Sequence, residues 1–336
     1  QKAIYLQKRF PFLISSLCSE IDESIIDEVE ERPYMLTQYN KSSEALQAAD
    51  SIAKFQKLDS KDAERLLAYA KHVIRYLFNN EKHYWFEIDY LCQRLIQAMK
   101  DSKNVWPAFI NKDEAIEAIK SCTYDENNST FVCLKEHYDE EKDLATKIKN
   151  IIKNDNIDLN VENIMDEIPL DLDSDQKDAL LSALSSSTLI CGLAGVGKTI
   201  VIKEIVRIFD MFGIPFKVMA PTGKASVRVS EGLGNITATT VHYAIATARK
   251  KKQERTTQTE EVIIIDESSM LSPHLLLNLL REVKVKRLII VGDHNQLPSI
   301  ESGCLLKDLI RAQVFPVIEL KQIHRQKDGS LIAERS

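Results

Sequence analysis

Residues 191–199 read Cys191-Gly192-Leu193-Ala194-Gly195-Val196-Gly197-Lys198-Thr199, and this stretch decides the fold. A glycine, four residues, and then Gly197-Lys198-Thr199 is the spacing of a Walker A phosphate-binding loop. An apolar run, 189–191, precedes it as a buried strand does, and a helical pattern from Ile200 to Ile208 follows. Backbone N–H groups reach phosphate oxygens only where no Cβ intervenes, and the following helix adds its N-terminal dipole. The stretch predicts a nucleoside triphosphate site; the alternative is a glycine-rich turn that holds a buried lysine.

The loop and its flank supply most of the candidate nucleotide ligands. We expect the Lys198 ammonium to reach the β- and γ-phosphates, and the Thr199 hydroxyl to help hold Mg²⁺. The predicted nucleotide-binding residues of this stretch are Gly192, Gly195, Val196, Gly197, Lys198, Thr199 and Ile200.

A second segment, Val262-Ile263-Ile264-Ile265-Asp266-Glu267, is an apolar strand that ends in two carboxylates, as a Walker B element does. Beside the phosphate-binding loop, Asp266 would hold Mg²⁺ together with Thr199, and Glu267 would polarise the attacking water. The alternative is a strand that happens to end in an acidic turn. The combination of the two motifs favours ATP hydrolysis.

Length and composition limit the class of protein in which these motifs occur. A chain of 336 residues suggests two or three domains, and its fractions of apolar residues, 44%, and charged residues, 28%, are ordinary for a globular protein. No apolar run is long enough for a bilayer, so no membrane partner is expected. The six cysteines form no CxxC pair, which favours reduced cysteines in an intracellular protein of the cytoplasm, nucleoid or nucleus over a zinc site. A net charge of −6 argues only weakly against nucleic acid, because a basic groove can lie on an acidic protein.

Strand-like and helix-like segments alternate from Leu172 onward, which is the signature of an α/β fold with a parallel sheet. We place this lobe at residues 156–336 and expect the polar stretch Asn154–Asn160 to be the hinge at its start. The expected strands are Thr188–Cys191, Phe216–Ala220, Val262–Asp266, Leu288–Val291 and Val317–Leu320.

The first half of the chain is mainly helical in pattern. Residues 1–82 form a predicted helical domain to which the sequence assigns no function. In residues 83–155, two amphipathic helices precede a strand at Phe131–Leu134, which is the order of a helix-turn-helix or winged-helix module. The second of these helices, Lys112–Lys120, mixes acidic residues with its lysines, so a structural or protein-contacting role is favoured over DNA reading.

One segment after a predicted strand offers groups to an anionic ligand. It reads Ala220-Pro221-Thr222-Gly223-Lys224-Ala225. Gly223 allows close approach of the backbone, while Thr222 and Lys224 supply donors.

Two further segments narrow the kind of ATP site. Val291–Pro298 carries Gln296, which is placed to sense the γ-phosphate. Gln322–Gln326 carries Arg325, which can stabilise charge in the transition state of hydrolysis.

Together these segments resemble the superfamily 1 helicases, and among them the RecD-like group that includes the α subunit of exodeoxyribonuclease V. The resemblance is strong over Leu172–Ser336 and implies a RecA-like motor lobe, while the helix, helix, hairpin segment is similar only loosely to the family's winged-helix-like region. The segments similar to motifs I, Ia, II, III and IV are Gly192–Thr199, Ala220–Ala225, Asp266–Met270, Val291–Ile300 and Gln322–Gln326.

The resemblance implies further site residues. Asp175-Gln176 is similar to the family's glutamine motif, which implies that Gln176 reads adenine and selects ATP. Thr240-Val241-His242 is similar to a Thr-Ile-His segment that contacts the DNA strand. The DNA-binding residues so implied are Pro221, Thr222, Lys224 and His242.

The leading hypothesis is an ATP-hydrolysing DNA helicase or translocase with ATP and Mg²⁺ as ligands and single-stranded DNA as partner. The resemblance implies movement from 5′ to 3′, work in recombination, repair or replication, and a nuclease or another repair-complex protein as partner. The alternative is a nucleic-acid-binding or assembly subunit in which ATP is a structural ligand. A P-loop ATPase or kinase without motor function would not explain Gly292–Pro298.

Two departures from the family pattern carry expectations of their own. Relatives have a second RecA-like lobe with motifs V and VI, whereas this chain stops soon after motif IV. We therefore expect the chain alone to bind nucleotide but to hydrolyse it poorly and not to unwind DNA. The polar stretch Arg249–Thr259 is expected to be a solvated linker rather than a DNA clamp.

Overall fold

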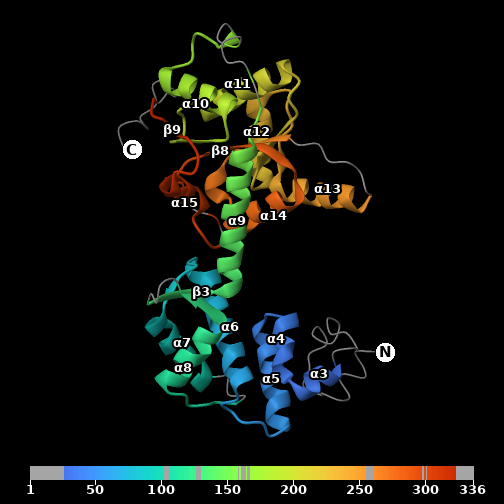
Figure 1. Cartoon of the computed structure of the whole chain (residues 1–336), viewed down its shortest axis with the longest axis vertical. Coiled ribbons are helices and arrows are strands. Elements are labelled where there is room, and N and C mark those ends of the chain that lie inside the picture. The colour runs from blue at the N-terminus through green and yellow to red at the C-terminus, as the bar shows by residue number, and fades with distance from the viewer. Residues whose placement is uncertain are drawn as a thin grey trace. The chain divides into compact units, whose positions relative to one another are not determined.

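Figure 1 shows the computed structural model of the chain, which describes residues 26–101, 106–125, 130–157, 159, 164, 167–254, 261–296, 299 and 301–322. The chain forms two compact units, Gln1–Asp139 and Glu140–Ser336. The boundary between them falls inside one helix, α9 (Lys135–Asn154). The three-part division predicted from the sequence stays a prediction.

The N-terminal unit combines helices with a small antiparallel sheet in which β3 lies between β1 and β2. The predicted order of helix, helix and hairpin is present here as α7, α8, β2 and β3. The elements are α3 (Ile26–Glu31), η2 (Pro33–Met35), α4 (Leu36–Tyr39), α5 (Ser43–Phe55), α6 (Ala63–Glu81), β1 (Phe86–Glu87), α7 (Ile88–Asp101), α8 (Lys112–Cys122), β2 (Thr123–Asp125), β3 (Phe131–Leu134) and the start of α9.

One hydrophobic cluster runs through this unit from Val29 to Leu134, so the predicted boundary after residue 82 lies within a shared core. At its centre, Arg65 and Asp50 form a fully buried ion pair with a distance of 2.8 Å between Nη2 and Oδ2. The hydroxyls of Tyr34 and Tyr69 also donate to the Asp50 carboxylate. A buried charge is tolerated only when it is paired and hydrogen-bonded, and this network meets that condition.

The C-terminal unit is built on a six-stranded parallel sheet, which confirms the predicted fold class. Its strand order is β6-β5-β7-β8-β4-β9. All five predicted strands are present, and the sheet adds one short edge strand that the sequence did not indicate. The strands are β4 (Thr188–Gly192), β5 (Phe216–Ala220), β6 (Thr239–Thr240), β7 (Glu261–Ile265), β8 (Val285–Gly292) and β9 (Val317–Leu320).

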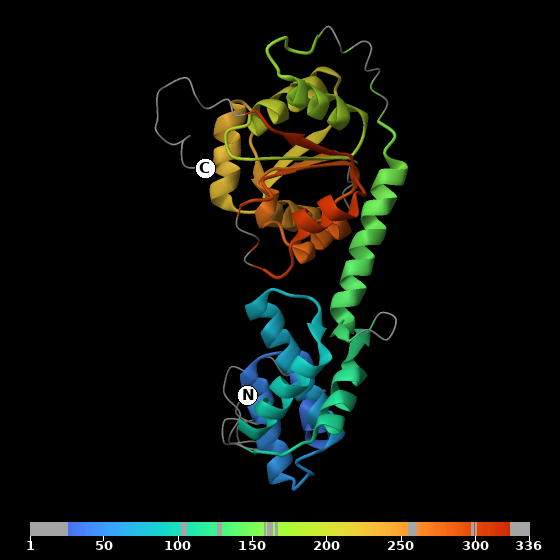
Figure 2. The same cartoon turned by 90° about the vertical axis from the view of Figure 1, so that its left-hand side faces the viewer.

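Helices cover both faces of this sheet (Figure 2). Alternate strand residues point to opposite faces, so Ile264 packs into one core and its neighbours Ile263 and Ile265 into the other. The apolar strands are buried on both sides for this reason. One layer contains α10 (Ser174–Ser185), α11 (Lys198–Met211) and α12 (Gly223–Leu233), and the other contains the end of α9 with α13 (Val241–Gln253), α14 (Pro273–Glu282) and α15 (Leu305–Ala312).

The end of α9 is fixed to the sheet by a buried ion pair. Arg287 on β8 bonds both carboxylate oxygens of Asp155, with a shortest distance of 2.8 Å, and also donates to carbonyls at the end of α10. Asp155 accepts further bonds from the backbone N–H and hydroxyl of Ser187, just before β4. The start of the polar stretch 154–160, predicted as a hinge, is therefore firmly anchored at Asp155.

Two expectations need a correction or a limit. Arg249–Gln253 belongs to α13 and is not part of a linker, because Arg249 and Lys252 both pair with Glu282 on the neighbouring helix α14. Glu254 follows this helix, and residues 255–259 of the predicted linker lie outside the described residues. None of the described helices combines the length and apolar character needed to cross a bilayer.

Candidate active site

The candidate site lies at the carboxyl edge of the parallel sheet, where loops from three neighbouring strands meet. β4 leads into the Walker A loop, β7 into Asp266-Glu267, and β8 into the segment that carries Gln296. In the sheet, β8 lies between β4 and β7. Because parallel strands end at the same edge, the topology brings together motifs that lie up to about a hundred residues apart.

Two glycines of the Walker A loop occupy positions that no other residue would fit. A Cβ on Gly192 would lie 2.8 Å from the carbonyl oxygen of Leu320 on β9. Gly197 has a φ of +88°, and a Cβ there would lie 2.3 Å from the side-chain nitrogen of Gln176. Gly195 also has a positive φ, of 91°. The loop thus bends back over the start of α11 and leaves its backbone N–H groups free of side-chain cover.

The Lys198 side chain folds back over this loop. Its ammonium group donates to the carbonyl oxygens of Gly192 at 2.7 Å and Leu193 at 2.9 Å. These contacts hold the ammonium charge beside the Walker A loop, at the N-terminal end of α11. An anionic ligand seated on the loop would meet both the lysine and the helix dipole.

Asp266 and Glu267 differ in their surroundings although they are adjacent. Asp266 is buried, and burial raises its pKa to about 6 against the opposing effect of a hydrogen bond from the Glu267 N–H. Glu267 has a left-handed backbone with a φ of 53°, a conformation that non-glycine residues seldom adopt. Residues held in such conformations concentrate at functional sites, because the surrounding structure has to enforce them.

Gln296 reaches the same site from β8. Its backbone N–H donates to the carbonyl of Asp293, and its side-chain oxygen lies 3.5 Å from the hydroxyl of Ser269, two residues after Glu267. The Walker B turn and the Gln296 loop are therefore linked by a weak hydrogen bond. Leu297, Pro298 and Ile300 lie outside the described residues.

A single cavity of about 540 Å³ joins these groups. It collects most of the predicted nucleotide, metal and catalytic residues, whereas Gly192, Val196 and Gln176 do not line it. Arg325 lies outside the described residues, so its predicted role stays a prediction. The lining residues are Ala194, Gly195, Gly197, Lys198, Thr199, Ile200, Arg228, Asp266, Glu267 and Gln296.

Gln176 lies behind the loop and is almost fully buried. Its side-chain oxygen accepts from the N–H of Asp173 in a capping box at the start of α10, and its nitrogen donates to the carbonyl of Val196 at 3.3 Å. In this position Gln176 braces the Walker A loop from below. Its predicted contact with adenine stays a prediction.

Arg228 lines the cavity although the sequence pattern did not single it out. It lies on α12, and this helix packs so tightly on α11 that a Cβ on Gly232 would come 2.6 Å from the Thr199 side chain. The glycine permits the close approach that carries the guanidinium over the phosphate-binding loop. The only sequence signal was that Arg228 lies one helical turn after Lys224 and so on the same face of the helix. This spacing points to the nucleotide site only once the packing of α12 against α11 is known.

Thr199 and Asp266 fit the chemistry of a magnesium site. Among the described residues, no group of three or more histidine, cysteine or acidic side chains converges as a metal cage. Magnesium in nucleotide sites is usually held by one or two protein oxygens and completed by phosphates and water, and the cavity offers such a donor set.

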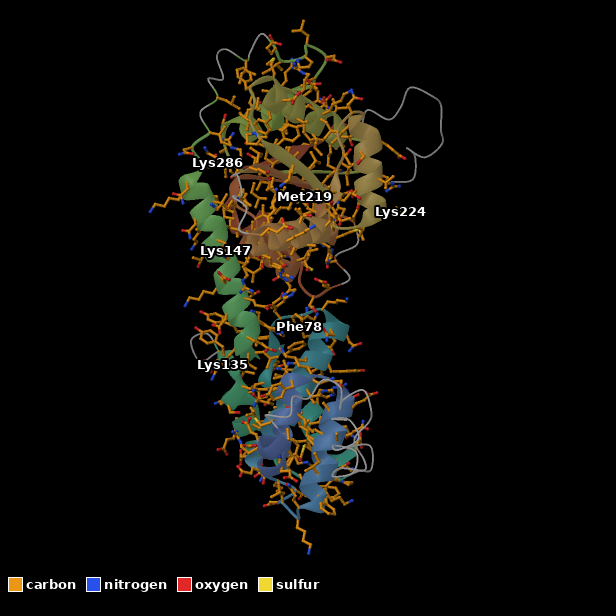
Figure 3. All side chains as sticks on the ribbon, turned by 90° about the vertical axis from the view of Figure 1, so that its right-hand side faces the viewer. Phe78, Lys135, Lys147, Met219, Lys224 and Lys286 are labelled. Carbon is orange, nitrogen blue, oxygen red and sulfur yellow. The ribbon has the colours of Figure 1, made fainter. Side chains whose placement is uncertain are left out.

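The predicted DNA-binding residues lie at the edge of the sheet formed by β5 and β6. Ala220 pairs with Thr240, so two helices begin side by side, α12 capped by the Thr222 hydroxyl and α13 capped by the Thr240 hydroxyl. Lys224 and His242, in the first turns of these helices, are exposed, whereas Pro221 is buried. Figure 3 labels Lys224 on α12 and Met219 within the sheet. The paired helix N-termini form an anion-attracting edge.

Comparison with known proteins finds relatives of the C-terminal half of the chain. The family model described as an AAA domain matches residues 171–336. The ATP-dependent RecD2 DNA helicase of Deinococcus radiodurans is 33% identical over 158 residues, which cover 46% of this chain and 22% of that protein. The RecBCD enzyme subunit RecD of Mycobacterium tuberculosis is 29% identical over 168 residues, which cover 42% of this chain and 29% of that subunit. The matched region thus spans less than a third of either relative.

A solved structure shows a partial likeness as well. The Pif1 helicase from Candida albicans aligns with 47% of this chain and 42% of its own chain, with 26% sequence identity and a TM-score of 0.36.

Proposed function

We propose that the C-terminal lobe of this chain is that of a RecD-like superfamily 1 helicase, and that the protein is an ATP-dependent DNA helicase or translocase. The observation that carries the proposal is the single cavity in which Lys198, Thr199, Asp266, Glu267 and Gln296 meet. It combines a phosphate cradle, a metal-binding pair, a carboxylate for the attacking water and an amide to sense the γ-phosphate. This is the set of parts that ATP hydrolysis coupled to movement requires.

Each part acts on the triphosphate through its position. Loop N–H groups and the α11 dipole hold the phosphates, and the Lys198 ammonium moves from the loop carbonyls to the β- and γ-oxygens. Bound Mg²⁺, held through Asp266 and Thr199, would neutralise charge that develops on the phosphates. The Glu267 carboxylate orients the attacking water, and Arg228, which also lines the cavity, adds positive charge near the phosphates.

The DNA strand is proposed to run along the edge where α12 and α13 begin. Two capped helix N-termini and the exposed Lys224 attract backbone phosphates without reading the bases, as a motor that moves over any sequence requires. β5 lies beside β7, the strand that leads to Asp266, so the strand contacts and the nucleotide cavity share one structural unit. A change at the γ-phosphate can therefore shift these contacts, with movement proposed to be from 5′ to 3′.

The proposed setting is inside the cell, in DNA recombination, repair or replication. RecD of Mycobacterium tuberculosis is named as a subunit of the RecBCD enzyme, and a protein partner of the nuclease or repair type is proposed for this chain on that likeness. Single-stranded DNA is proposed as the nucleic-acid partner.

Binding of a fluorescent ATP analogue tests the site assignment. Lys198→Ala should weaken binding by at least tenfold, because it removes the charge that faces the β- and γ-phosphates. Lys203→Ala is the matched control, since Lys203 is exposed on the same helix and does not line the cavity. Equal affinities for the two variants would refute the assignment, and tight binding without any dependence on DNA would favour the assembly-subunit alternative.

A further inference from the structure

The N-terminal unit contains a polar cavity of about 380 Å³ that the ATP site does not use. Its walls come from the stretch Arg32–Lys41, which includes η2 and α4, from one face of α6 and from the first turn of α9 (α4 and α6 are labelled in Figure 1). Basic side chains dominate the lining. The charged lining residues are Arg32, Lys41, Lys71, Arg75, Glu64 and Glu136.

The two acids of this cavity do not neutralise the four bases. Glu64 pairs with Arg32 at 2.7 Å, and Glu136 is shared by Lys41 at 3.3 Å and Arg75 at 3.0 Å. Four cations against two carboxylates leave an excess of two positive charges. The chain as a whole carries a net charge of −6, so this local excess runs against its general composition.

Lys71 is the least neutralised of the four bases. Within the described part of the chain, its ammonium has no carboxylate in ion-pair distance and no side-chain hydrogen bond. Lys71 and Arg75 are one helical turn apart on α6, so both point to the same face, and both side chains are half-buried. A half-buried ammonium without a counter-ion at the wall of a polar cavity has donors available for an anionic ligand.

The charge count of the cavity holds at neutral pH. Burial works against the charge on Glu136, but Arg75 and Lys41 outweigh it and hold the pKa of that carboxyl below its ordinary value. Glu136 is therefore ionised and fixes the direction of the Arg75 guanidinium. The guanidinium N–H groups that do not bond Glu136, together with the Lys71 ammonium, stay available for an anion.

We propose that this cavity binds the phosphate backbone of a DNA strand, and thus forms a second nucleic-acid contact, in the N-terminal unit. The choice of DNA as the source of the phosphates rests on the proposed function of the C-terminal lobe. Two excess charges match two phosphodiester groups, each of which carries one negative charge. Arginine and lysine side chains with room for a bound anion are the groups that phosphate recognition uses.

Two exposed aromatic residues, each the chain neighbour of a lining residue, favour a strand over a free phosphate ion. Tyr39 follows the lining residue Gln38 and is 51% exposed, and Tyr76 follows Arg75 and is 54% exposed. Exposed aromatic rings next to a basic groove provide surfaces on which bases stack. A free phosphate ion has no ring that could stack on these side chains.

Binding of a fluorescein-labelled oligothymidylate to the whole chain, measured by anisotropy over a series of salt concentrations, tests this inference. Lys71→Ala should weaken binding roughly fivefold and lower the slope of log affinity against log salt by about one. Lys100→Ala is the matched control, because Lys100 is exposed on α7 and does not line the cavity. Lys41→Ala provides a second test should Lys71→Ala impair folding, which circular dichroism would show.

The outcomes separate this inference from the proposed function. Unchanged binding by folded Lys71→Ala and Lys41→Ala, with a loss in Lys224→Ala on the motor lobe, would overturn the second contact and leave the motor assignment standing. Inorganic phosphate that protects Lys71 from acetylation, where the oligonucleotide does not, would identify a site for small anions and overturn the DNA contact. Protection by the oligonucleotide, lost in Tyr76→Ala, supports it. A parent chain that binds no DNA would contradict both proposals.

Discussion

The side-chain amide of Gln176 packs against Gly197 so closely that a β-carbon at position 197 would lie 2.3 Å from its nitrogen. A residue before the first strand of the lobe therefore supports the phosphate-binding loop from behind. The backbone at Gly197 is also left-handed, with a φ of +88°. The backbone conformation favours glycine here, and any β-carbon would also have to displace the Gln176 amide from the loop.

Gly197→Ala is expected to abolish nucleotide binding while the lobe still folds. Gly213→Ala is the matched control, because Gly213 also has a positive φ, of 64°, but its β-carbon would meet nothing within 4 Å. The control should lose about 1 kcal/mol of stability and keep its affinity. Titration of a fluorescent ATP analogue measures both variants, and full binding by Gly197→Ala would contradict the packing.

Gln176→Ala is expected to weaken nucleotide binding and to relax the preference for ATP over GTP. The first effect follows from the lost brace between Gln176 and the Val196 carbonyl, and the second from the proposed reading of adenine. Affinities for both nucleotides separate the two roles. A loss that is equal for ATP and GTP would leave the brace and remove the adenine role.

Burial of Asp266 predicts how the stability of the metal-free and nucleotide-free protein depends on pH. Its pKa in the folded chain is raised to about 6, above the ordinary aspartate value, so its contribution to stability is complete at low pH and is lost as pH rises through about 6. Asp266→Asn should therefore be more stable than the parent at pH 8 in EDTA, by up to roughly 3 kcal/mol. The gain should shrink toward pH 5. A gain that does not vary with pH would contradict the buried, charged state of Asp266.

Arg287→Ala is expected to destabilise the C-terminal unit strongly. It leaves the buried Asp155 carboxylate without its counter-charge, with only the bonds from Ser187, and removes the donor to the carbonyls at the end of α10, a loss of roughly 3–5 kcal/mol. Arg281→Ala is the matched control, because the Arg281–Asp143 pair is 2.8 Å long but solvent-exposed, and its loss should cost less than about 1 kcal/mol. Urea unfolding measures both, and similar midpoints would show that the buried pair contributes little.

The parts of the structure that could be predicted from the sequence are those set by local pattern. Both β5 and β9 have the bounds that their mainly apolar stretches predict, although each carries one charged residue, Lys217 in β5 and Glu319 in the edge strand β9. The apolar strands that lead into the Walker A loop and Asp266 were predicted from the same kind of pattern. Parallel topology then places their ends together without further information.

The parts that could not be predicted depend on contacts between distant residues. Arg228 enters the cavity only because Gly232 allows α12 to approach Thr199. Arg287 and Asp155 are 132 residues apart, and the sequence around each residue gives no sign that the two form an ion pair. In the N-terminal unit, helices before and after residue 82 pack into one core. The sequence shows that each of these helices has an apolar face, but it does not show which helix that face packs against.

The rate of ATP hydrolysis by the native protein, with and without single-stranded DNA, tests the central claim most directly. We predict that DNA raises the rate at least tenfold and that Lys198→Ala removes both the basal and the stimulated rate, whereas Lys203→Ala retains them. Equal rates for the parent and Lys198→Ala, or a parent rate that DNA does not change, would contradict the assignment of this lobe as a DNA-dependent motor.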